Sequence, residues 1–250
     1  MARATIDESP RTAVPSAMDV PPPETVALPS GPVEITWRRA ARARRISLRL
    51  DPTGSGVVIT LPARASRKAG LALLTGHHDW VAERLAARPP AVDFADGAEI
   101  PIGGVPHRIR HVPDARGGAW LDGEHLCVTG APEFLRRRVT HFLKAEAGRR
   151  LATLVVEKAR AAEVTPRRIT MKDTSSRWGS CAPDGSLAFS WRLVMAPPFV
   201  QDYVAAHEVA HLKHLNHGPL FWALVARLTP HTKQAMRWLR AEGSRLLRIG

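Results

Sequence analysis

Two histidines and a glutamate lie within one short segment whose apolar spacing predicts a helix over residues 199–215. His207 and His211 are four residues apart, so on a helix they share a face and both rings can reach one metal ion. Glu208 follows the first histidine and can reach a water molecule bound to that ion. A carboxylate there acts as a general base once the metal has lowered the pKa of the water towards about 7. These residues predict metal-assisted hydrolysis.

A hydrolytic zinc site needs a third protein ligand and an open fourth position, and two more histidines follow this segment. On a continuous helix His214 would lie about 10.5 Å along the axis from His207, with His211 between them, and three rings in a line cannot surround an ion. His217 precedes a Gly-Pro pair, which ends a helix and lets the chain turn back. We therefore predict one zinc ion bound by His207, His211 and His217, with His214 as a neighbour.

Amide hydrolysis also needs a partner for the developing negative charge, and three side chains are candidates for this contact or for contact with substrate. Arg177 lies in a loop between two expected strands, where stacking on Trp178 or a structural ion pair is the alternative. Tyr203 is one turn before His207 on the same helix face, where packing with a satisfied hydroxyl is the alternative. His231 follows a Thr-Pro pair and is either a proton donor or a surface residue.

Other reactive or aromatic residues near these motifs are expected to be structural. The two cysteines cannot form a four-thiolate zinc site, and a fourth protein ligand would close the metal, so Cys181 is expected to be a small buried residue. Burial of a tryptophan removes a large apolar area from water. We therefore expect a core role for the tryptophans around the metal-binding segment, which are Trp178, Trp191, Trp222 and Trp238.

The residue patterns of the segments that must position these residues predict an α+β chain. Residues 1–32 hold 7 of the 21 prolines without apolar periodicity, so a disordered tail is expected there. Alternating and β-branched residues predict a β-rich subdomain with one helix, at 65–87, over residues 33–130. Residues 131–250 are expected to form the catalytic domain, with a long helix from Pro132, a mostly antiparallel sheet and the helix that carries His207.

Three segments of this second half form a recognisable set. Residues 207–222 read HEVAHLKHLNHGPLFW, residues 177–181 read RWGSC and residues 190–193 read SWRL. Together they resemble the YgjP-like metallopeptidases, which are relatives of the SprT-like and WLM zincins. The resemblance is strongest over 169–239.

The resemblance implies a zincin catalytic domain, a protein or peptide substrate, and one zinc ion held by His207, His211 and His217, with Glu208 as the catalytic residue. Two positions depart from the family pattern. Ser190 stands where the family often has asparagine, and His231 stands where an acidic residue is common. A role for the position of Ser190 is therefore in doubt, and His231 adds either a proton donor or a surface change.

The charge balance raises a second hypothesis. The chain has 36 basic and 23 acidic residues, a net charge of +13, which attracts polyanions. A cluster of arginines comprises Arg38, Arg39, Arg42, Arg44, Arg45 and Arg49. A solvated sheet face that discourages edge aggregation is favoured over nucleic-acid binding, because only Trp37 lies nearby to stack on a base. The alternative is a nucleic-acid-associated module, or a protease of DNA-linked proteins, that uses this arginine-rich part.

Composition limits the class of protein. With 44% hydrophobic residues the chain can bury a proper core. No uncharged apolar run approaches about 18 residues, and the first residues lack the apolar stretch of a secretory signal. We therefore expect a soluble protein of the cytoplasm without a membrane partner.

Overall fold

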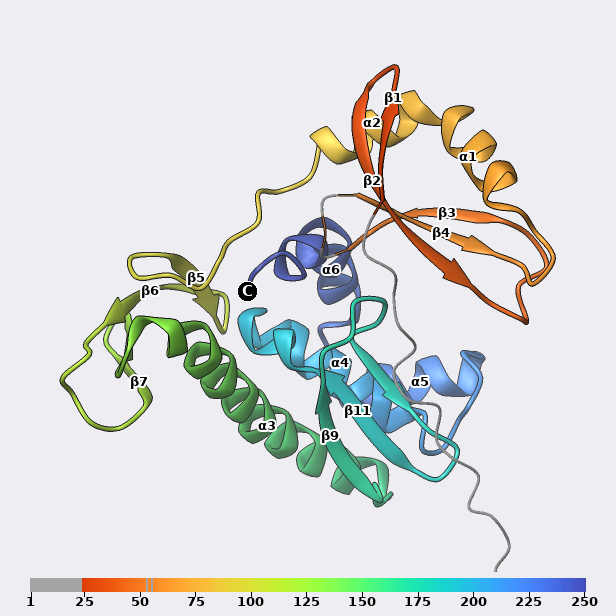
Figure 1. Cartoon of the computed structure of the whole chain (residues 1–250). Coiled ribbons are helices and arrows are strands. Elements are labelled where there is room, and N and C mark those ends of the chain that lie inside the picture. The colour runs from red at the N-terminus through yellow and green to blue at the C-terminus, as the bar shows by residue number, and fades with distance from the viewer. Residues whose placement is uncertain (1–23, 53, 55) are drawn as a thin grey trace, which may run out of the picture. The chain divides into compact units, whose positions relative to one another are not determined.

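A computed structural model describes residues 24–52, 54 and 56–250, and Figure 1 shows its helices and strands. These residues form two compact units, one of 24–51 and 56–86 and the other of 87–250 with residues 52 and 54. The first unit has one sheet and the second has two, and each unit has its own hydrophobic core. The mixed α+β class predicted from the sequence is confirmed. Among the described residues, no helix combines the length and the apolar character that crossing a membrane requires.

The first unit is built on a four-stranded sheet. Its central strands, β2 and β4, run parallel, whereas each outer strand pairs antiparallel with its neighbour. The small antiparallel sheet expected here is therefore a mixed one, because β4 inserts between β2 and β3 instead of continuing the meander. In sheet order the strands are β1 (Glu24–Leu28), β2 (Gly31–Arg39), β4 (Val57–Leu61) and β3 (Ser47–Leu50).

Two short helices, α1 (Arg67–Thr75) and α2 (His78–Ala86), pack on one face of this sheet. Ser66 caps α1 by accepting a hydrogen bond from Ala69 N. The single helix expected at 65–87 is divided at Gly76, where α1 ends. The core between sheet and helices is made of alternate strand residues and two helix residues: Val33, Ile35, Trp37, Val57, Ile59, Leu61, Leu74 and Val81.

The structure differs from the expected disordered tail in its last part. Residues 24–32 belong to β1 and to the start of β2, and Val26 pairs with Val33 across the hairpin. The turn is possible because Gly31 has a φ of 115°, a conformation that favours glycine. Pairing of β-branched residues outweighs the proline-rich composition here. The rest of the expected tail, residues 1–23, lies outside the described residues.

The second unit begins with a four-stranded sheet that the sequence assigned to the amino-terminal half. Its Ile100, Ile109 and Leu126 share one core with the helices of the catalytic half, and Gly103 N donates to Val194 O at 2.7 Å. The compact units therefore divide at 86/87, whereas the expected boundary was 130/131. In sheet order the strands are β5 (Glu99–Ile102), β6 (Val105–His111), β8 (His125–Val128) and β7 (Ala119–Asp122).

A long helix and a small sheet form the frame of the second unit. The helix α3 (Leu135–Ala162) follows a short 3-10 turn, η1 (Pro132–Phe134), and ends where Glu163 adopts a left-handed conformation. The sheet pairs β11 parallel with β9 and antiparallel with β10, so it is mixed, whereas a mostly antiparallel sheet was expected. β10 is an edge strand of this sheet. In sheet order the strands are β10 (Gly179–Cys181), β11 (Ser186–Ser190) and β9 (Arg168–Lys172).

Helix α4 (Pro198–Ala210) lies at the centre of the second unit and contacts α3, α5 (Pro219–Leu228), α6 (Thr232–Leu246) and β10. Pro198 at its first turn suits the helix start, because proline there removes no intrahelical hydrogen bond. A polar anchor holds the helix: Lys158 Nζ lies 2.6 Å from Asp202 Oδ1, and Thr229 Oγ1 donates to Asp202 Oδ2 at 2.5 Å. α4 is thus tied to α3 and to the end of α5.

A buried arginine ties the segments beside the small sheet together. Arg192 lies in the 3-10 turn η2 (Trp191–Met195), and its guanidinium donates to Asp173 Oδ1 and to the carbonyls of Leu246 and Ile249. Its ring neighbour is Trp191, 4.4 Å from the guanidinium carbon to the ring centroid. The connection from β9 to β10 is therefore fixed to the end of α6.

Candidate metal centre

The end of α4 determines which histidines can meet. The helix ends at Ala210 and His211 caps it, so it is shorter than the expected 199–215. The chain then leaves the helix through turns in which Lys213 N and His214 N donate to Ala210 O. It reaches Gly218, the residue before α5. Because the helix stops early, the following loop returns and brings His217 beside the last turn of α4.

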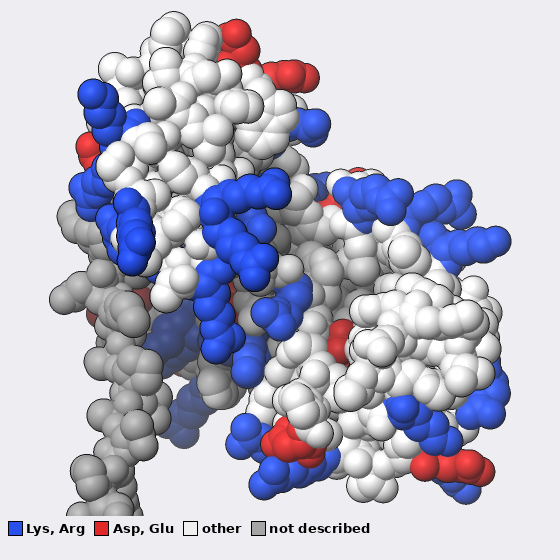
Figure 2. All heavy atoms as spheres, turned by 90° about the vertical axis from the view of Figure 1, so that its right-hand side faces the viewer, with Lys and Arg blue, Asp and Glu red and all other residues white. Residues whose placement is uncertain are grey.

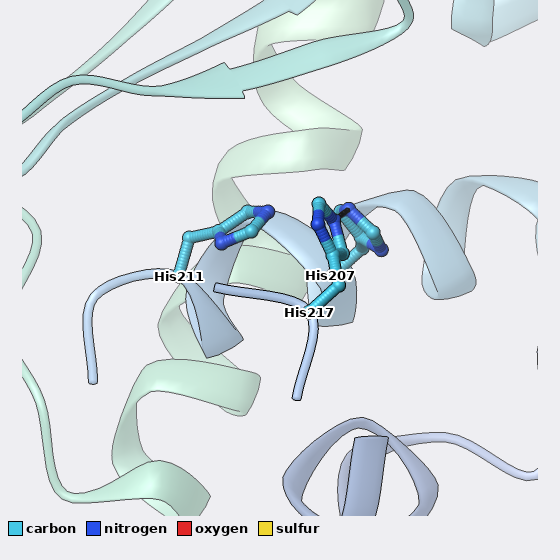
Figure 3. Close-up of side chains that lie close together, drawn as sticks. All are labelled: His207, His211 and His217. Carbon is cyan, nitrogen blue, oxygen red and sulfur yellow. Dashed lines mark hydrogen bonds between the residues drawn. The ribbon is translucent and has the colours of Figure 1, made fainter. Parts of the chain in front are cut away.

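Three imidazole rings converge at this point. One ligand nitrogen from each of His207, His211 and His217 lies within 4.8 Å of the others. The ring centroids are 4.9 Å apart for His207 and His211, 5.1 Å for His207 and His217, and 4.7 Å for His211 and His217. Figure 3 shows the rings of the two helix residues and of the loop residue facing a common space. Within the described residues, this is the group of potential ligands close enough to share an ion.

The spacing of the nitrogens fits a small tetrahedral ion. Two nitrogens bound to zinc at 2.0–2.1 Å in tetrahedral geometry lie about 3.4 Å apart. His207 Nε2 and His217 Nε2 are 3.2 Å apart. The three histidines therefore fit the metal that the sequence predicts.

A backbone contact orients one of these rings. His211 Nδ1 lies 3.1 Å from His214 O, and because a carbonyl oxygen only accepts, the nitrogen donates. The proton is then held on Nδ1, and Nε2 of His211 is left with a free lone pair. This contact uses the backbone of His214, whose side chain is absent from the converging group. The prediction that His214 is a neighbour and not a third member of the group agrees with this arrangement.

The surroundings keep His207 and His211 neutral. Burial, together with the nearby His211 and His217, lowers the pKa of His207 to about 4. Burial likewise lowers the pKa of His211. The buried ring of Phe221 lies 5.0 Å from His207 and 4.6 Å from His211, centroid to centroid. Neutral imidazoles have the lone pairs that metal ligation requires.

Glu208 lies beside the histidines but is not among the atoms that could share an ion with them. Only 5% of its surface is exposed. Burial raises the pKa of Glu208 to about 7, and the charge of Arg177 acts in the opposite direction. A carboxyl group with this pKa exchanges a proton readily near neutral pH. Its position and its pKa both suit a group that transfers protons rather than one that binds the metal.

The side chain of Glu208 packs directly against the edge strand β10. A Cβ atom added at Gly179 would lie 2.5 Å from both Cγ and Oε1 of Glu208, closer than real contacts allow. Only glycine therefore fits at the start of β10 with the carboxyl group in this position. The absence of a side chain at residue 179 lets the backbone of the strand approach the carboxyl group.

The three candidate contact residues lie in different surroundings. Tyr203 Oη is 3.5 Å from His207 Nδ1, on the side of the ring opposite Nε2. Arg177 is exposed in the connection between β9 and β10, and its backbone carbonyl accepts from Thr174 Oγ1 at 2.8 Å. His231 precedes α6, and its ring lies 6.1 Å from that of Phe199, at the other end of α4 from His207. The structure brings Tyr203 and Arg177 towards the histidines and Glu208, but not His231.

Sequence reasoning missed the position of Trp222. It was expected in the core, as Trp191 is, but 36% of its surface is exposed. Its ring lies 6.0 Å from that of His207 and 5.9 Å from that of His217. The helical pattern could have indicated this exposure. Trp222 follows the buried Phe221 on a helix and must therefore point about 100° away from it.

Cys181 is partly exposed in β10 and lies outside the converging group in the described part of the chain. Burial raises the pKa of its thiol, and the charges of Glu208 and Asp184 raise it further. A thiol with a raised pKa is a poor nucleophile and a poor ligand at neutral pH.

Comparison with known proteins gives one match. The model of a family described as YgjP-like, metallopeptidase domain, matches residues 44–242, which is most of the chain. The matched span contains the three histidines, Glu208 and Gly179. Searches of curated proteins and of solved structures found no match.

Proposed function

The chain belongs to the YgjP-like metallopeptidase family, and from this premise we propose that it is a zinc peptidase of the zincin type. The family assignment supports a metal-dependent peptidase in general. The ligands, the metal and the roles of individual residues are our proposal. The observation that carries it is the convergence of three imidazoles next to a buried carboxyl group that is not one of the converging groups.

We propose that His207, His211 and His217 hold one zinc ion. Three nitrogen ligands suit a four-coordinate zinc with one position left for water or substrate. Such an ion, when bound, lowers the pKa of a water molecule and polarises the carbonyl of the bond to be cleaved. The contact from His211 Nδ1 to His214 O and the contact of Tyr203 Oη with His207 Nδ1 would orient two of the rings.

Glu208 is the proposed general base. Its carboxylate would accept a proton from the attacking water and would then return the proton to the departing amine. The buried position supports this role, since a group with a pKa of about 7 can both take and release a proton at neutral pH. Hydrolysis would add the elements of one water across the peptide bond and release a carboxylate and an amine.

Arg177 is the proposed partner of the negative charge that develops on the substrate carbonyl. Its guanidinium is exposed, yet close enough to lower the pKa of Glu208, so it can act on charge near that residue. Tyr203 is assigned to orienting His207, because its hydroxyl lies at the Nδ1 side of the ring. His231 has no place in this proposal, because it packs against Phe199 at the distant end of α4.

An extended peptide is the proposed form of the substrate. β10 is an edge strand with β11 on one side, so its other side has backbone groups that can pair with an added strand. Gly179 at its start lies against Glu208, which puts this edge next to the proposed base. The exposed ring of Trp222 offers an apolar surface beside His207 and His217 for a substrate side chain.

We also propose that the activity operates in the cytoplasm. The two cysteines, Cys127 and Cys181, are both free. Free thiols persist in a reducing compartment, whereas an oxidising one favours disulfides.

The test is metal analysis of the purified full-length chain combined with digestion of an unbiased peptide library. We expect one zinc ion per chain, cleavage that stops when a chelator removes the metal, and recovery when zinc is returned. Peptide cleavage that persists after complete removal of metal would disprove the proposal, as would a zinc-loaded chain that cleaves neither library peptides nor unfolded proteins.

A further inference from the structure

We propose that the first unit binds the sugar-phosphate backbone of duplex nucleic acid through an arginine-rich surface formed by one face of its sheet and the loops at one end of that sheet. This inference does not depend on the proposed peptidase activity, because it concerns residues of the other unit. It rests on how the fold rearranges the arginine cluster seen in the sequence.

The sheet of the first unit has one face without helices in that unit. Val33, Ile35 and Trp37 of β2 point into the core beneath α1 and α2, so Arg38 points to the opposite face. Arg49 of β3 lies between the core-facing Leu48 and Leu50 and points the same way. β4 separates the two strands, and Arg38 pairs with Thr60 whereas Arg49 pairs with Val58, so the two arginines are offset by two residues and lie about 12 Å apart.

Strand pairing brings Arg64, which is distant in the sequence, close to the arginine cluster. It also gives Arg39, a member of the cluster, a structural role. β2 and β4 run parallel and end together, with Arg39 opposite Leu61. The segments that follow the two strands, 40–46 and 62–66, therefore begin side by side. Arg39 NH1 donates to Ala63 O at 2.6 Å and also to Pro62 O and Ala65 O, so it fastens these segments together. The second segment contributes Arg64, which the sequence cluster did not include.

The resulting arginine surface consists of Arg38, Arg42, Arg44, Arg45, Arg49 and Arg64, all exposed. Among the described residues, no carboxylate lies within the 4.0 Å of an ion pair with any of these six guanidinium groups. The acidic residues of the neighbouring strands lie at the other end of the sheet: Glu34 precedes the pair of Ile35 with Val57, and Asp51 follows Leu50. Five of the six arginines thus lie at the opposite end of the sheet, whereas Arg49, opposite Val58, lies near the acidic end.

Grouping like charges without counterions destabilises a fold, but it creates a strong local positive potential. Basic side chains also outnumber acidic ones on the face of the molecule that Figure 2 presents. A phosphate backbone offers regularly spaced negative charges, and arginine binds phosphate with two parallel hydrogen bonds. The chemistry of the arginine surface therefore fits a nucleic-acid backbone.

Duplex nucleic acid fits better than a single strand. Binding of single strands relies on aromatic rings that stack on unpaired bases. Trp37, the tryptophan nearest to these arginines, is buried on the core side of the sheet, where Glu24 accepts from its Nε1 at 2.7 Å and Arg67 lies over its ring. The arginine surface provides hydroxyl groups from Thr36, Ser47 and Thr60 instead, which can bond to phosphate. We therefore expect binding that depends little on base sequence.

The experiment measures fluorescence anisotropy of a labelled duplex of about 20 base pairs with the full-length chain at several salt concentrations. If four to six arginines contact phosphates, affinity should fall about 10²- to 10³-fold between about 50 and 200 mM salt. The test variant replaces Arg42, Arg44 and Arg45 with Gln. It should lower the steepness of the salt dependence by about 2 to 3 in the log-log slope.

A matched control variant removes the same number of charges from the second unit. Arg108, Arg110 and Arg116 are exposed there, without an ion pair among the described residues, and are also replaced with Gln. Binding of the duplex should remain nearly unchanged in this control if the site is localised. Equal losses in both variants would overturn the proposal, because net charge alone would then explain binding. It would also be overturned if the duplex does not bind at about 50 mM salt, or if a single strand, anionic vesicles or a polyglutamate chain bind as tightly as the duplex.

Discussion

The two polar regions of this chain use charge in opposite ways. Around α4, a few titratable groups are removed from water, and each has altered properties: the pKa of His207 is about 4 and that of Glu208 is about 7. On the first unit, six arginines stand in solvent on one face of a sheet and in the loops at one end of it. Burial changes what a single group can do, whereas exposed charges act through their number.

This difference has a consequence for substitutions. Around Glu208 and the converging imidazoles, each group contacts its own particular neighbours, so no other residue can compensate for a single change, and the effect of that change should be large. On the arginine surface each charge is hydrated and screened, so the loss of one leaves the rest in place. The following substitutions test this contrast.

The largest expected effect comes from Glu208→Gln. Glutamine has nearly the same shape but cannot accept the proton of water, so the turnover number should fall by about 10²- to 10⁴-fold. Zinc content and the cooperative unfolding transition should be retained, because no ligand is changed and no charge is buried. Peptide-cleavage rates and metal analysis of the same sample measure both properties. A Gln variant with wild-type turnover would contradict the role of Glu208 as base.

A pair of histidine substitutions should give the next largest effect. His217→Ala removes one of the three converging nitrogens and should weaken zinc binding by more than about 100-fold, beyond the loss typical of a group that merely supports a ligand. His214→Ala removes the same kind of side chain three residues away, yet leaves the carbonyl that accepts from His211 Nδ1. Its zinc affinity should therefore be close to that of the wild type. Equal losses in competition titrations with a metal indicator would show that the ligand assignment is wrong.

The smallest expected effect comes from a single change on the other region. Arg44→Gln should weaken duplex binding by less than about tenfold near 100 mM salt and lower the log-log slope by about 0.9. The same variant should cleave peptides at the wild-type rate, since Arg44 belongs to the first unit. A single arginine substitution that abolished duplex binding would show that this surface behaves like a shaped pocket, and the contrast drawn above would fail.

The main elements of the second unit could be predicted from the sequence because they depend on local patterns. Apolar residues at helical spacing marked α3, and a proline pair marked the start of α4. The grouping of His207, His211 and His217 follows from the four-residue spacing and from the Gly-Pro pair after His217. The family resemblance over the same residues agrees with the family match.

Features that depend on distant pairing could not be read from the sequence. The parallel pairing of β2 with β4 depends on the insertion of β4 between two earlier strands, which no local pattern specifies. The end of α4 at Ala210 was missed because apolar residues continue to Leu215, an exposed leucine that extends the helical pattern without being buried. The compact units divide at 86/87 and not at the expected 130/131, because contacts such as that of Gly103 with Val194 join segments far apart in the chain.

Gly179 has no functional group, yet its missing methyl group lets β10 touch Glu208. In a saturation mutagenesis screen for activity, this position should tolerate as few replacements as the histidines do, although a screen for folding alone would tolerate more. A comparison of the two screens would separate residues that react from residues that leave room for a reaction. The absence of a side chain at residue 179 can thus be as strictly required for activity as a charged side chain is at another position.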